Sequence, residues 1–191
     1  IDGSAVIVCT AVDITQKKKN QQKIEYQANN DFLTGLYNRM KCELDLRNII
    51  CDAVCSNQKG ALMFIDLDDF KHINDGLGHQ YGDLLLQQIA AGLQGIPGLR
   101  GHCYRMGGDE FVVIVKPEQF IGLSKIIKNV VALFNRPWYL RGTEYFCTMS
   151  MGVATFPDNS DDVHEIVKMA DMAMYDAKRS GKNRYNFYDG S

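Results

Sequence analysis

The sequence predicts an α/β sandwich of the α+β type, in which helices pack against one central sheet. Two observations predict it: strand-like and helix-like segments alternate along the chain, and two pairs of strands are separated by tight turns. The chain has 191 residues, of which 46% are hydrophobic, enough for one domain with a sizeable core. Its 21 basic and 23 acidic residues give a net charge of −2, which excludes a disordered chain and argues against a nucleic-acid binder.

The first 30 residues are expected to lie outside the globular domain. Residues 5–12 form a short strand-like run, and residues 16–30 are polar and basic, without Gly or Pro. The second stretch has only a thin apolar stripe, which includes Ile24 and Tyr26. It therefore predicts a connector helix between domains, or one half of a parallel coiled coil. We expect the domain itself to begin at Asp31.

The elements of the domain follow from hydrophobic spacing. Apolar residues recur at helical spacing in some segments and form short apolar runs, typical of buried strands, in others. Gly60 ends the first helix, and the successive glycines Gly107 and Gly108 predict a hairpin turn. Helices are predicted over residues 40–56, 84–93, 120–134 and 163–178. Strands are predicted over residues 61–67, 103–105, 111–115, 138–143, 145–154 and 185–188, with the fourth and fifth forming a second hairpin.

No apolar run approaches the roughly 18 residues needed to cross a bilayer, so no membrane contact is expected within these residues. The chain begins with Ile1 and shows no signal peptide, which indicates a piece of a longer cytoplasmic protein. The six cysteines fit neither a zinc site nor a redox C-x-x-C motif. We expect incidental thiols in a reducing compartment.

Carboxylates gather at the end of the strand predicted over residues 61–67. Asp66 and Asp68 project to the same face of an extended segment, because side chains alternate with a period of two. Two carboxylates on one face repel unless a cation joins them, which favours a hard divalent ion such as Mg²⁺. The alternative is that this acidic run caps the following helix.

A second acidic segment lies in the predicted hairpin turn, where Gly107 and Gly108 precede Asp109 and Glu110. The glycines let the backbone approach a ligand closely, and the turn would place Asp109 beside Asp66 if the two strands are neighbours in the sheet. Taken alone, the segment is an ordinary turn. The metal site gains support because another acidic strand end occurs elsewhere in the chain.

The glycine-rich segment 74–83 suits the recognition of a purine. Asn74 and Asp83 carry side chains that can hydrogen-bond the edge of a guanine. Asp83 is equally well placed to cap a helix beginning at Leu84, and for His79 a buried structural role is favoured. Candidate phosphate ligands, with simple solvation as the alternative, are Lys71, Lys178 and Lys182.

Five segments resemble, in order and spacing, the motifs of the GGDEF domains, the diguanylate cyclases that condense two GTP molecules into cyclic di-GMP. The segments are DFLTGLYNR (31–39), DLDDFKHINDGLGHQYGD (66–83), RMGGDEF (105–111), SMGVA (150–154) and ADMAMYDAKRSGKNR (170–184). Together they cover about residues 31–188. The resemblance implies a palm-like nucleotidyl-cyclase fold, with a central, mostly antiparallel sheet flanked by helices and preceded here by a connector helix.

The resemblance also implies the active site. The implied ligands of two Mg²⁺ (or Mn²⁺) ions per active site are Asp66, Leu67 through its carbonyl, Asp109 and Glu110. The three carboxylates among them are the implied catalytic residues. Asn74 and Asp83 match the pair that reads guanine. The implied substrate-binding set is completed by Phe70, Lys71, Lys178, Lys182, Gly107 and Gly108.

One site has room for one GTP, so the reaction implies a homodimer that brings two half-sites face to face. The run that ends at residues 12–15 resembles the last strand of a PAS sensor. This assigns residues 1–15 to a sensor tail, 16–30 to the connector helix and 31–191 to the cyclase domain. Segment 183–189 resembles the junction at which many such proteins continue into an EAL domain. The implied setting is cytoplasmic second-messenger signalling in bacteria.

The chain departs from the family at the product-inhibition site. The family's R-x-x-D motif corresponds here to Gly98 and Gly101, while Arg100 is out of register. We therefore expect no tight feedback by cyclic di-GMP through this site.

Diguanylate cyclase activity is the favoured function, because every catalytic position of the family is intact. The main alternative is a regulatory GTP-binding domain that no longer turns over and controls an attached EAL phosphodiesterase. A third class, the protein-interaction scaffold, would be expected to have eroded carboxylates, and this sequence retains them.

Overall fold

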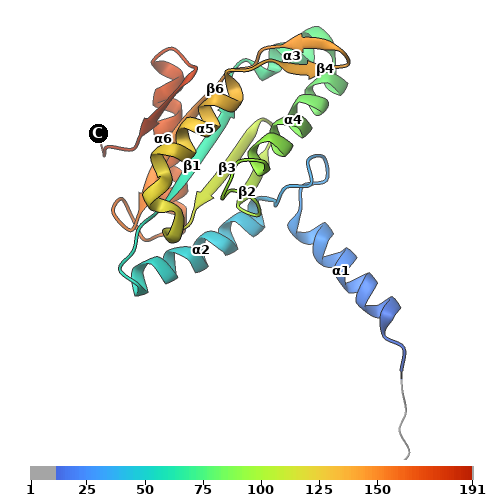
Figure 1. The fold of residues 1–191 in the computed structure, drawn as a ribbon, viewed down its shortest axis with the longest axis vertical. Coiled ribbons are helices and arrows are strands. Elements are labelled where there is room, and N and C mark those ends of the chain that lie inside the picture. The colour runs from blue at the N-terminus through green and yellow to red at the C-terminus, as the bar shows by residue number, and fades with distance from the viewer. Residues whose placement is uncertain (1–11, 191) are drawn as a thin grey trace, which may run out of the picture.

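The structure is a computed structural model that describes residues 12–190. Apart from Val12, the strand predicted over residues 5–12 lies outside the described residues. The first helix, α1 (Thr15–Asn29), projects away from the rest of the chain and buries none of its side chains (Figure 1). Both Ile24 and Tyr26 are exposed on it. A helix is therefore present where the connector was predicted.

The centre of the fold is a five-stranded sheet in the order β2-β3-β1-β6-β7. Its strands are β1 (Gly60–Leu67), β2 (Cys103–Gly107), β3 (Glu110–Val115), β6 (Met149–Phe156) and β7 (Arg184–Phe187). The middle strand, β1, pairs antiparallel with both β3 and β6, β2 pairs antiparallel with β3, and β6 pairs parallel with β7. The mostly antiparallel central sheet predicted from the sequence is confirmed.

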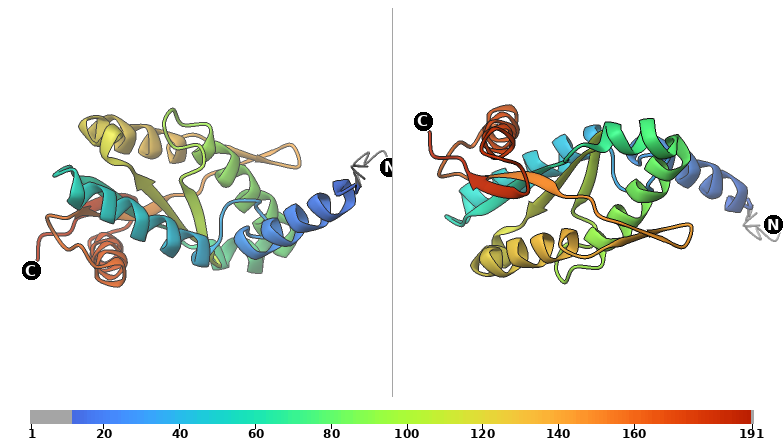
Figure 2. Two further views of the ribbon diagram at one scale, coloured as in Figure 1. Left: turned by 90° about the horizontal axis from the view of Figure 1, so that it is seen from below. Right: turned by 90° about the horizontal axis from the view of Figure 1, so that it is seen from above.

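Helices cover both faces of this sheet (Figure 2). On one face α2 (Arg39–Cys55) and α6 (Val163–Arg179) pack against a core that includes Leu62 and Phe64. On the other face α4 (His79–Gln94) and α5 (Leu123–Phe134) pack against alternate residues of the same strand, such as Met63 and Ile65. Every residue of β1 is buried, because helices lie on both of its sides.

Helix α6 lies unusually close to the sheet at Gly152 of β6. A Cβ atom at this position would fall 1.9 Å from the Ala170 carbonyl oxygen and 2.3 Å from the Met174 amide nitrogen. Only glycine fits there. The close approach holds α6 along the strands and brings its last turn, which carries Lys178, to the end of β1.

Three elements differ from the sequence prediction. The second hairpin is short, formed by β4 (Trp138–Leu140) and β5 (Thr143–Tyr145), and β6 belongs to the main sheet. Arg141 and Gly142 both have positive φ, which suits a two-residue hairpin turn that the sequence analysis missed. Helix α4 begins at His79 and follows a short helix, α3 (Phe70–Leu77). A 3-10 turn, η1 (Pro117–Gly122), occupies the start of the helix predicted over residues 120–134.

Two further observations concern residues 12–190. None of the helices described there is both long and apolar enough to span a membrane. The five cysteines in this range are free thiols, three of them buried (Cys42, Cys103 and Cys147) and two exposed (Cys51 and Cys55).

Candidate active site

Strand pairing brings the two acidic segments together. Asp66 near the end of β1 is the direct partner of Glu110 at the start of β3, and the Leu67 amide donates to the Asp109 carbonyl oxygen at 3.2 Å. Side chains alternate along a strand, so Asp66 and Glu110 share the face that α2 and α6 cover. The condition under which the turn lies beside Asp66, that these two strands are neighbours in the sheet, is therefore met.

The turn between β2 and β3 is open and anchored by one arginine. Gly107 and Gly108 both have positive φ, and a Cβ at either position would meet no atom within 4 Å. The guanidinium of Arg105 donates to the Gly108 carbonyl oxygen at 3.1 and 2.7 Å and to both carboxylate oxygens of Asp31 at 3.1 and 3.0 Å. The turn therefore leaves space for a ligand while Arg105 fixes its backbone.

Asp66 is buried, with 7% of its surface exposed, whereas Asp109 and Glu110 are half-buried. Its Oδ1 accepts a 2.5 Å hydrogen bond from Nζ of Lys178. Burial raises the pKa of Asp66 to about 6; the charges of Asp109 and Glu110 add to the rise, and the ammonium of Lys178 opposes it. A cationic group thus already occupies one side of this carboxylate.

Glu110 has its own basic partner. The guanidinium nitrogen of Arg39, the first residue of α2, lies 4.0 Å from Oε2 of Glu110. Burial raises the pKa of Glu110, and the charge of Asp171 on α6 raises it further, while Arg39 opposes the rise. Asp171 was not among the predicted site residues. Its position two helical turns before Lys178, on one face of the same helix, was the signal available in the sequence.

The carboxylates suit a hard cation that arrives with its own ligands. Residues 12–190 contain no preformed group of three or more side chains of the metal-ligating types. Mg²⁺ in nucleotide sites is commonly held by one or two carboxylates, with substrate phosphates and water completing its shell. The Lys178 ammonium binds Asp66, which indicates that a positive charge is favourable beside this carboxylate. The donor set therefore fits Mg²⁺ or Mn²⁺ bound together with a phosphorylated substrate.

Asp68 has a structural position, in contrast to Asp66. It is 5% exposed and accepts hydrogen bonds from the Thr148 and Ser150 hydroxyls, both at 2.7 Å, and from the Asn183 amide at 3.0 Å. These donors occupy both of its oxygens, so the hypothesis that it shares a metal ion with Asp66 is not supported. Asp69, at the N-cap of α3, makes no side-chain cap bond, and the helix-cap alternative for this run is wrong.

Helices α3 and α4 bring the predicted purine-reading pair together. The side chain of Asn74 lies over Gly82, where a Cβ would fall 1.9 Å from Asn74 Oδ1, and Asp83 follows directly. Because α4 begins at His79, Asp83 lies inside the helix and does not cap one at Leu84. His79 is exposed, so the buried role favoured for it is wrong.

Two of the predicted phosphate ligands pair with aspartates, one near the end of β1 and one in the turn after it, and the third lies in the first turn of α3. Lys178 contacts Asp66, and Nζ of Lys182 lies 2.6 Å from Oδ1 of Asp69. Lys71 is exposed on α3, one residue after Phe70, which packs partly against the core. The structure thus places both C-terminal lysines beside the carboxylate site.

Comparison with known proteins decides the family. A family model described as "Diguanylate cyclase, GGDEF domain" matches residues 28–184. The chain belongs to this family. It contains the motif turn and the acidic strand ends of a GGDEF domain in the arrangement described above.

Several curated relatives match this GGDEF chain. It is 32% identical over 182 residues to the bifunctional diguanylate cyclase/cyclic di-GMP phosphodiesterase MucR of Pseudomonas aeruginosa, covering 95% of this chain and 27% of MucR. It is 36% identical over 161 residues to the diguanylate cyclase TpbB of the same species (83% and 37%). It is 30% identical over 181 residues to the cyclic di-GMP phosphodiesterase PdeR of Escherichia coli (94% and 27%). The chain spans about a quarter of the length of the first curated relatives.

Solved GGDEF structures share the fold. The GGDEF domain of TpbB superposes with a TM-score of 0.78 at 35% identity, covering 84% of this chain and 94% of that one. The coiled coil and GGDEF domain of DgcB from Caulobacter crescentus, solved in complex with c-di-GMP, gives a TM-score of 0.79 at 27% identity, covering 92% and 93%. These matches confirm the predicted fold class.

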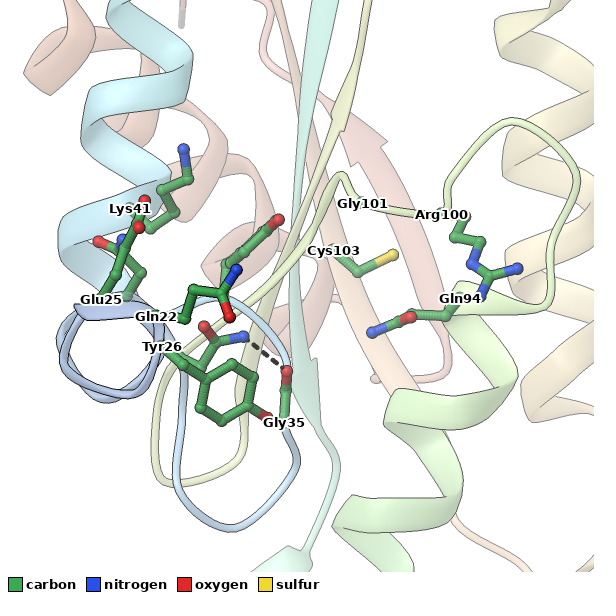
Figure 3. A pocket seen from close by; sticks show the side chains of 12 residues that line it. Gln22, Glu25, Tyr26, Gly35, Lys41, Gln94, Arg100, Gly101 and Cys103 are labelled. Atoms are coloured by element: carbon green, nitrogen blue, oxygen red, sulfur yellow. Dashed lines mark hydrogen bonds between the residues drawn. The ribbon is translucent and has the colours of Figure 1, made fainter. Parts of the chain in front are cut away.

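The loop that corresponds to the family's product-inhibition site is built differently from the motif turn. Gly98 and Gly101 both have positive φ, and the amide of Gln119 donates to the Gly98 carbonyl oxygen at 2.7 Å. A Cβ at Gly98 would fall 2.9 Å from that amide nitrogen. Beside this loop a cleft of about 530 Å³ separates α1 from the domain, and Arg100 lies on its wall (Figure 3).

Proposed function

We propose that this GGDEF domain is a diguanylate cyclase, which condenses two GTP molecules into cyclic di-GMP and releases pyrophosphate. The observation that carries the proposal is the cross-strand pair of Asp66 and Glu110 beside Asp109. Two of these carboxylates are neutralised by basic side chains that a metal and a nucleotide can replace. A domain that had lost nucleotide binding would not be expected to retain these paired charges.

The proposed metal ligands are Asp66, the carbonyl of Leu67, Asp109 and Glu110, holding two Mg²⁺ or Mn²⁺ ions with phosphate oxygens of GTP. When bound, the ions stabilise negative charge on the attacking and leaving oxygens. Lys178 would exchange Asp66 for a phosphate oxygen, and Lys182 would exchange Asp69 in the same way. Both exchanges keep each ammonium paired with an anion.

The remaining substrate contacts orient the nucleotide. We assign the guanine edge to Asn74 on α3 and Asp83 on α4, because the Asn74 side chain packs against Gly82, the residue before Asp83. The open turn at Gly107 and Gly108 gives the phosphates and ribose access to the strand ends. Lys71 and the backbone near Phe70 complete the proposed set around the terminal phosphates.

In the proposed bond-forming step, the 3′-oxygen of one GTP joins the α-phosphorus of the other, and the bond from that phosphorus to pyrophosphate breaks in line. Glu110 is assigned as the acceptor of the 3′-hydroxyl proton, a role that suits its raised pKa. Two such steps close the ring. Because each half-site holds one GTP, a homodimer must supply the second half-site.

The connector helix provides a route by which another domain could control this pairing. Helix α1 leads directly into Asp31, whose carboxylate is held by Arg105, and Arg105 also holds the Gly108 carbonyl in the motif turn. We propose that residues 1–15 are the end of a PAS-like sensor domain and that residues 16–30 connect it to the cyclase domain at residues 31–191. We also propose that this part of the parent protein lies in the cytoplasm. An EAL domain beyond the C-terminus is part of the same proposal.

A second candidate function is a regulatory GTP-binding domain that does not cyclise and controls an attached phosphodiesterase. Two relatives support this candidate. MucR and PdeR are both named as cyclic di-GMP phosphodiesterases, MucR as a bifunctional one, and this chain covers only 27% of each. Both functions require GTP to bind. They differ in whether a dimer of this domain forms cyclic di-GMP.

One assay separates the two. The chain is fused to a coiled coil that enforces a parallel dimer, and product is measured by chromatography with GTP and Mg²⁺. Cyclic di-GMP that disappears in Asp109→Ala supports the cyclase. GTP binding without any product in the enforced dimer would favour the regulatory domain.

A further inference from the structure

The turn that follows α6 has an unusual backbone. Helix α6 ends in a Schellman motif, because the Lys182 amide donates to the Ala177 carbonyl oxygen at 3.2 Å and the Gly181 amide donates to the next carbonyl oxygen along the helix at 3.3 Å. Gly181 has a φ of 118°, in the range that favours glycine. The next two residues, Lys182 and Asn183, also have positive φ, of 61° and 47°. Two successive non-glycine residues in this conformation need support from the surrounding structure.

The support comes from the connection between β1 and α3. The two lysines of the site, Lys178 and Lys182, each pair with an aspartate there, one on either side of Asp68 in the sequence. Oδ2 of Asp68 itself accepts a hydrogen bond from the Asn183 amide at 3.0 Å. The turn at residues 181–183 is therefore attached to the end of β1 by two ion pairs and, between them, by one bond to its backbone.

These three attachments differ in whether a substrate can displace them. In the proposed reaction both lysines leave their aspartates for phosphate oxygens, and their side chains are exposed enough for this, Lys178 by 29% and Lys182 by 43%. Asp68 is buried, and it also accepts from the hydroxyls of Thr148 and Ser150, which fix its carboxylate. Of the three attachments, the bond to Asp68 is the one that remains when both lysines have moved.

We propose that Asp68 is a positioning residue for phosphate binding: by holding the Asn183 amide, it keeps Lys178 and Lys182 within reach of the nucleotide after both have left their aspartates. The inference rests on the proposed function, because it requires these lysines to bind the phosphates of GTP. In this role Asp68 acts through the backbone of the turn, without touching the nucleotide or the metal.

A general loss of stability must be separated from this role, because Asp68 is buried and hydrogen-bonded. A loss of folded protein would weaken the binding of every ligand alike. Loss of the turn would weaken the binding of phosphorylated ligands alone. Two probes therefore distinguish the effects: a GTP analogue that cannot react, with Mg²⁺, and guanosine, which has no phosphate.

Two variants disrupt the turn in independent ways. Asp68→Ala removes the acceptor of the Asn183 amide, and Gly181→Ala places alanine at a φ that it rarely adopts. We expect each to weaken binding of the GTP analogue about tenfold, the scale of one hydrogen bond to a charged group, and to leave guanosine binding unchanged. Asp68→Asn should keep most of the affinity for the analogue, because its amide oxygen can still accept from Asn183. Isothermal titration measures the analogue, and ligand-observed nuclear magnetic resonance measures guanosine, at a temperature at which circular dichroism shows each variant folded.

Two matched controls accompany these variants. Thr148→Val removes another donor to Asp68 but leaves the bond from Asn183 in place. Gly101→Ala introduces alanine at another glycine with positive φ, in the loop before β2. Both controls should leave the affinity for both probes unchanged.

Equal weakening of the two probes by Asp68→Ala and Gly181→Ala would show that Asp68 is merely structural and would overturn the inference. Unchanged binding of the analogue in either folded variant would also overturn it, and Gly181→Ala decides the outcome if Asp68→Ala does not fold. Lys178→Ala distinguishes these results from a failure of the proposed function. If Lys178→Ala weakens binding of the analogue and the turn variants do not, the phosphate site stands and the inference falls. If the unmodified chain does not bind the analogue, the proposed function and the role of Asp68 are both excluded.

Discussion

Two loops at opposite ends of one strand, β2, make an instructive contrast. The motif turn at residues 107–110 follows β2, is open, and is surrounded by carboxylates with basic partners. The loop at residues 98–101 precedes β2, and the amide of Gln119 closes over its backbone. Both loops rely on glycines with positive φ. Glycine geometry therefore does not by itself indicate a site; the charged side chains around it do.

The largest effect is expected at the motif end. Asp66→Asn should lower formation of cyclic di-GMP in an enforced dimer by about a thousandfold, because it removes a charged metal ligand. Arg100→Gln, at the other end of β2, should leave the rate within about twofold, the effect of a surface substitution away from the chemistry. Chromatographic measurement of product tests both. More than a tenth of the activity remaining in Asp66→Asn would contradict the proposed site.

The next effect concerns stability and separates the two neighbouring aspartates. Asp68→Asn should lower the free energy of unfolding by about 2–3 kcal/mol, because a buried acceptor of three hydrogen bonds is replaced by a group that also presents donors. Denaturant unfolding followed by circular dichroism measures it. Thr148→Val, which removes one of the three donors, should cost less. Equal stability of Asp68→Asn and the unmodified chain would show that Asp68 is not structural.

Arg105 connects the motif turn to the start of the domain, so its removal tests whether the turn needs anchoring. Arg105→Lys keeps the charge but cannot hold Asp31 and the Gly108 carbonyl together. We expect the rate to fall about tenfold through misplacement of the turn. The control is Lys116→Arg, the reverse substitution directly after the end of β3, which should leave the rate unchanged. An unaltered rate in Arg105→Lys would mean that the glycines position the turn unaided.

The pH dependence of stability should reveal the buried carboxylate. Asp66 has a pKa of about 6 in the folded state, above its ordinary value, so the folded state binds the proton more tightly than the unfolded state does. The contribution of Asp66 to the free energy of unfolding therefore increases by about 1 kcal/mol as the pH falls from 7 to 5. The measured quantity is the difference in unfolding free energy between the unmodified chain and Asp66→Asn. A difference that is constant or moves the other way between these pH values would contradict the raised pKa.

The sequence predicted the positions that local patterns determine. The β1 and β3 strand ends, the glycine turn and the helices α2 and α6 follow from apolar spacing and turn residues, and the structure has them in place. The resemblance to the family also predicted that Asn74 and Asp83 act as a pair. In the structure they lie on the successive helices α3 and α4, where the residue pattern alone had predicted a loop.

What the sequence could not predict depends on contacts between distant segments. Asp66 and Asp68 look equivalent by alternation, but the hydroxyls of Thr148 and Ser150 bind only Asp68. The second hairpin is present, but its turn was predicted at the wrong residues, because Arg141, with φ of 50°, has a left-handed conformation that arginine seldom adopts. Lys178 reaches Asp66 because α6 packs closely against the sheet at Gly152, and this contact joins segments that are distant in the sequence.

The smallest expected effect lies at the loop before β2. Without charged groups at Gly98 and Gly101, cyclic di-GMP should show no submicromolar binding to the chain by isothermal titration, and added product should not slow the reaction. Gln119→Ala tests whether the covering amide is the reason. It opens the space over Gly98 but supplies no cation, so binding should remain absent. Tight binding to the unmodified chain would contradict the contrast between the two loops. Binding that appears only in Gln119→Ala would show that coverage by the amide, and not the missing charges, blocks the site.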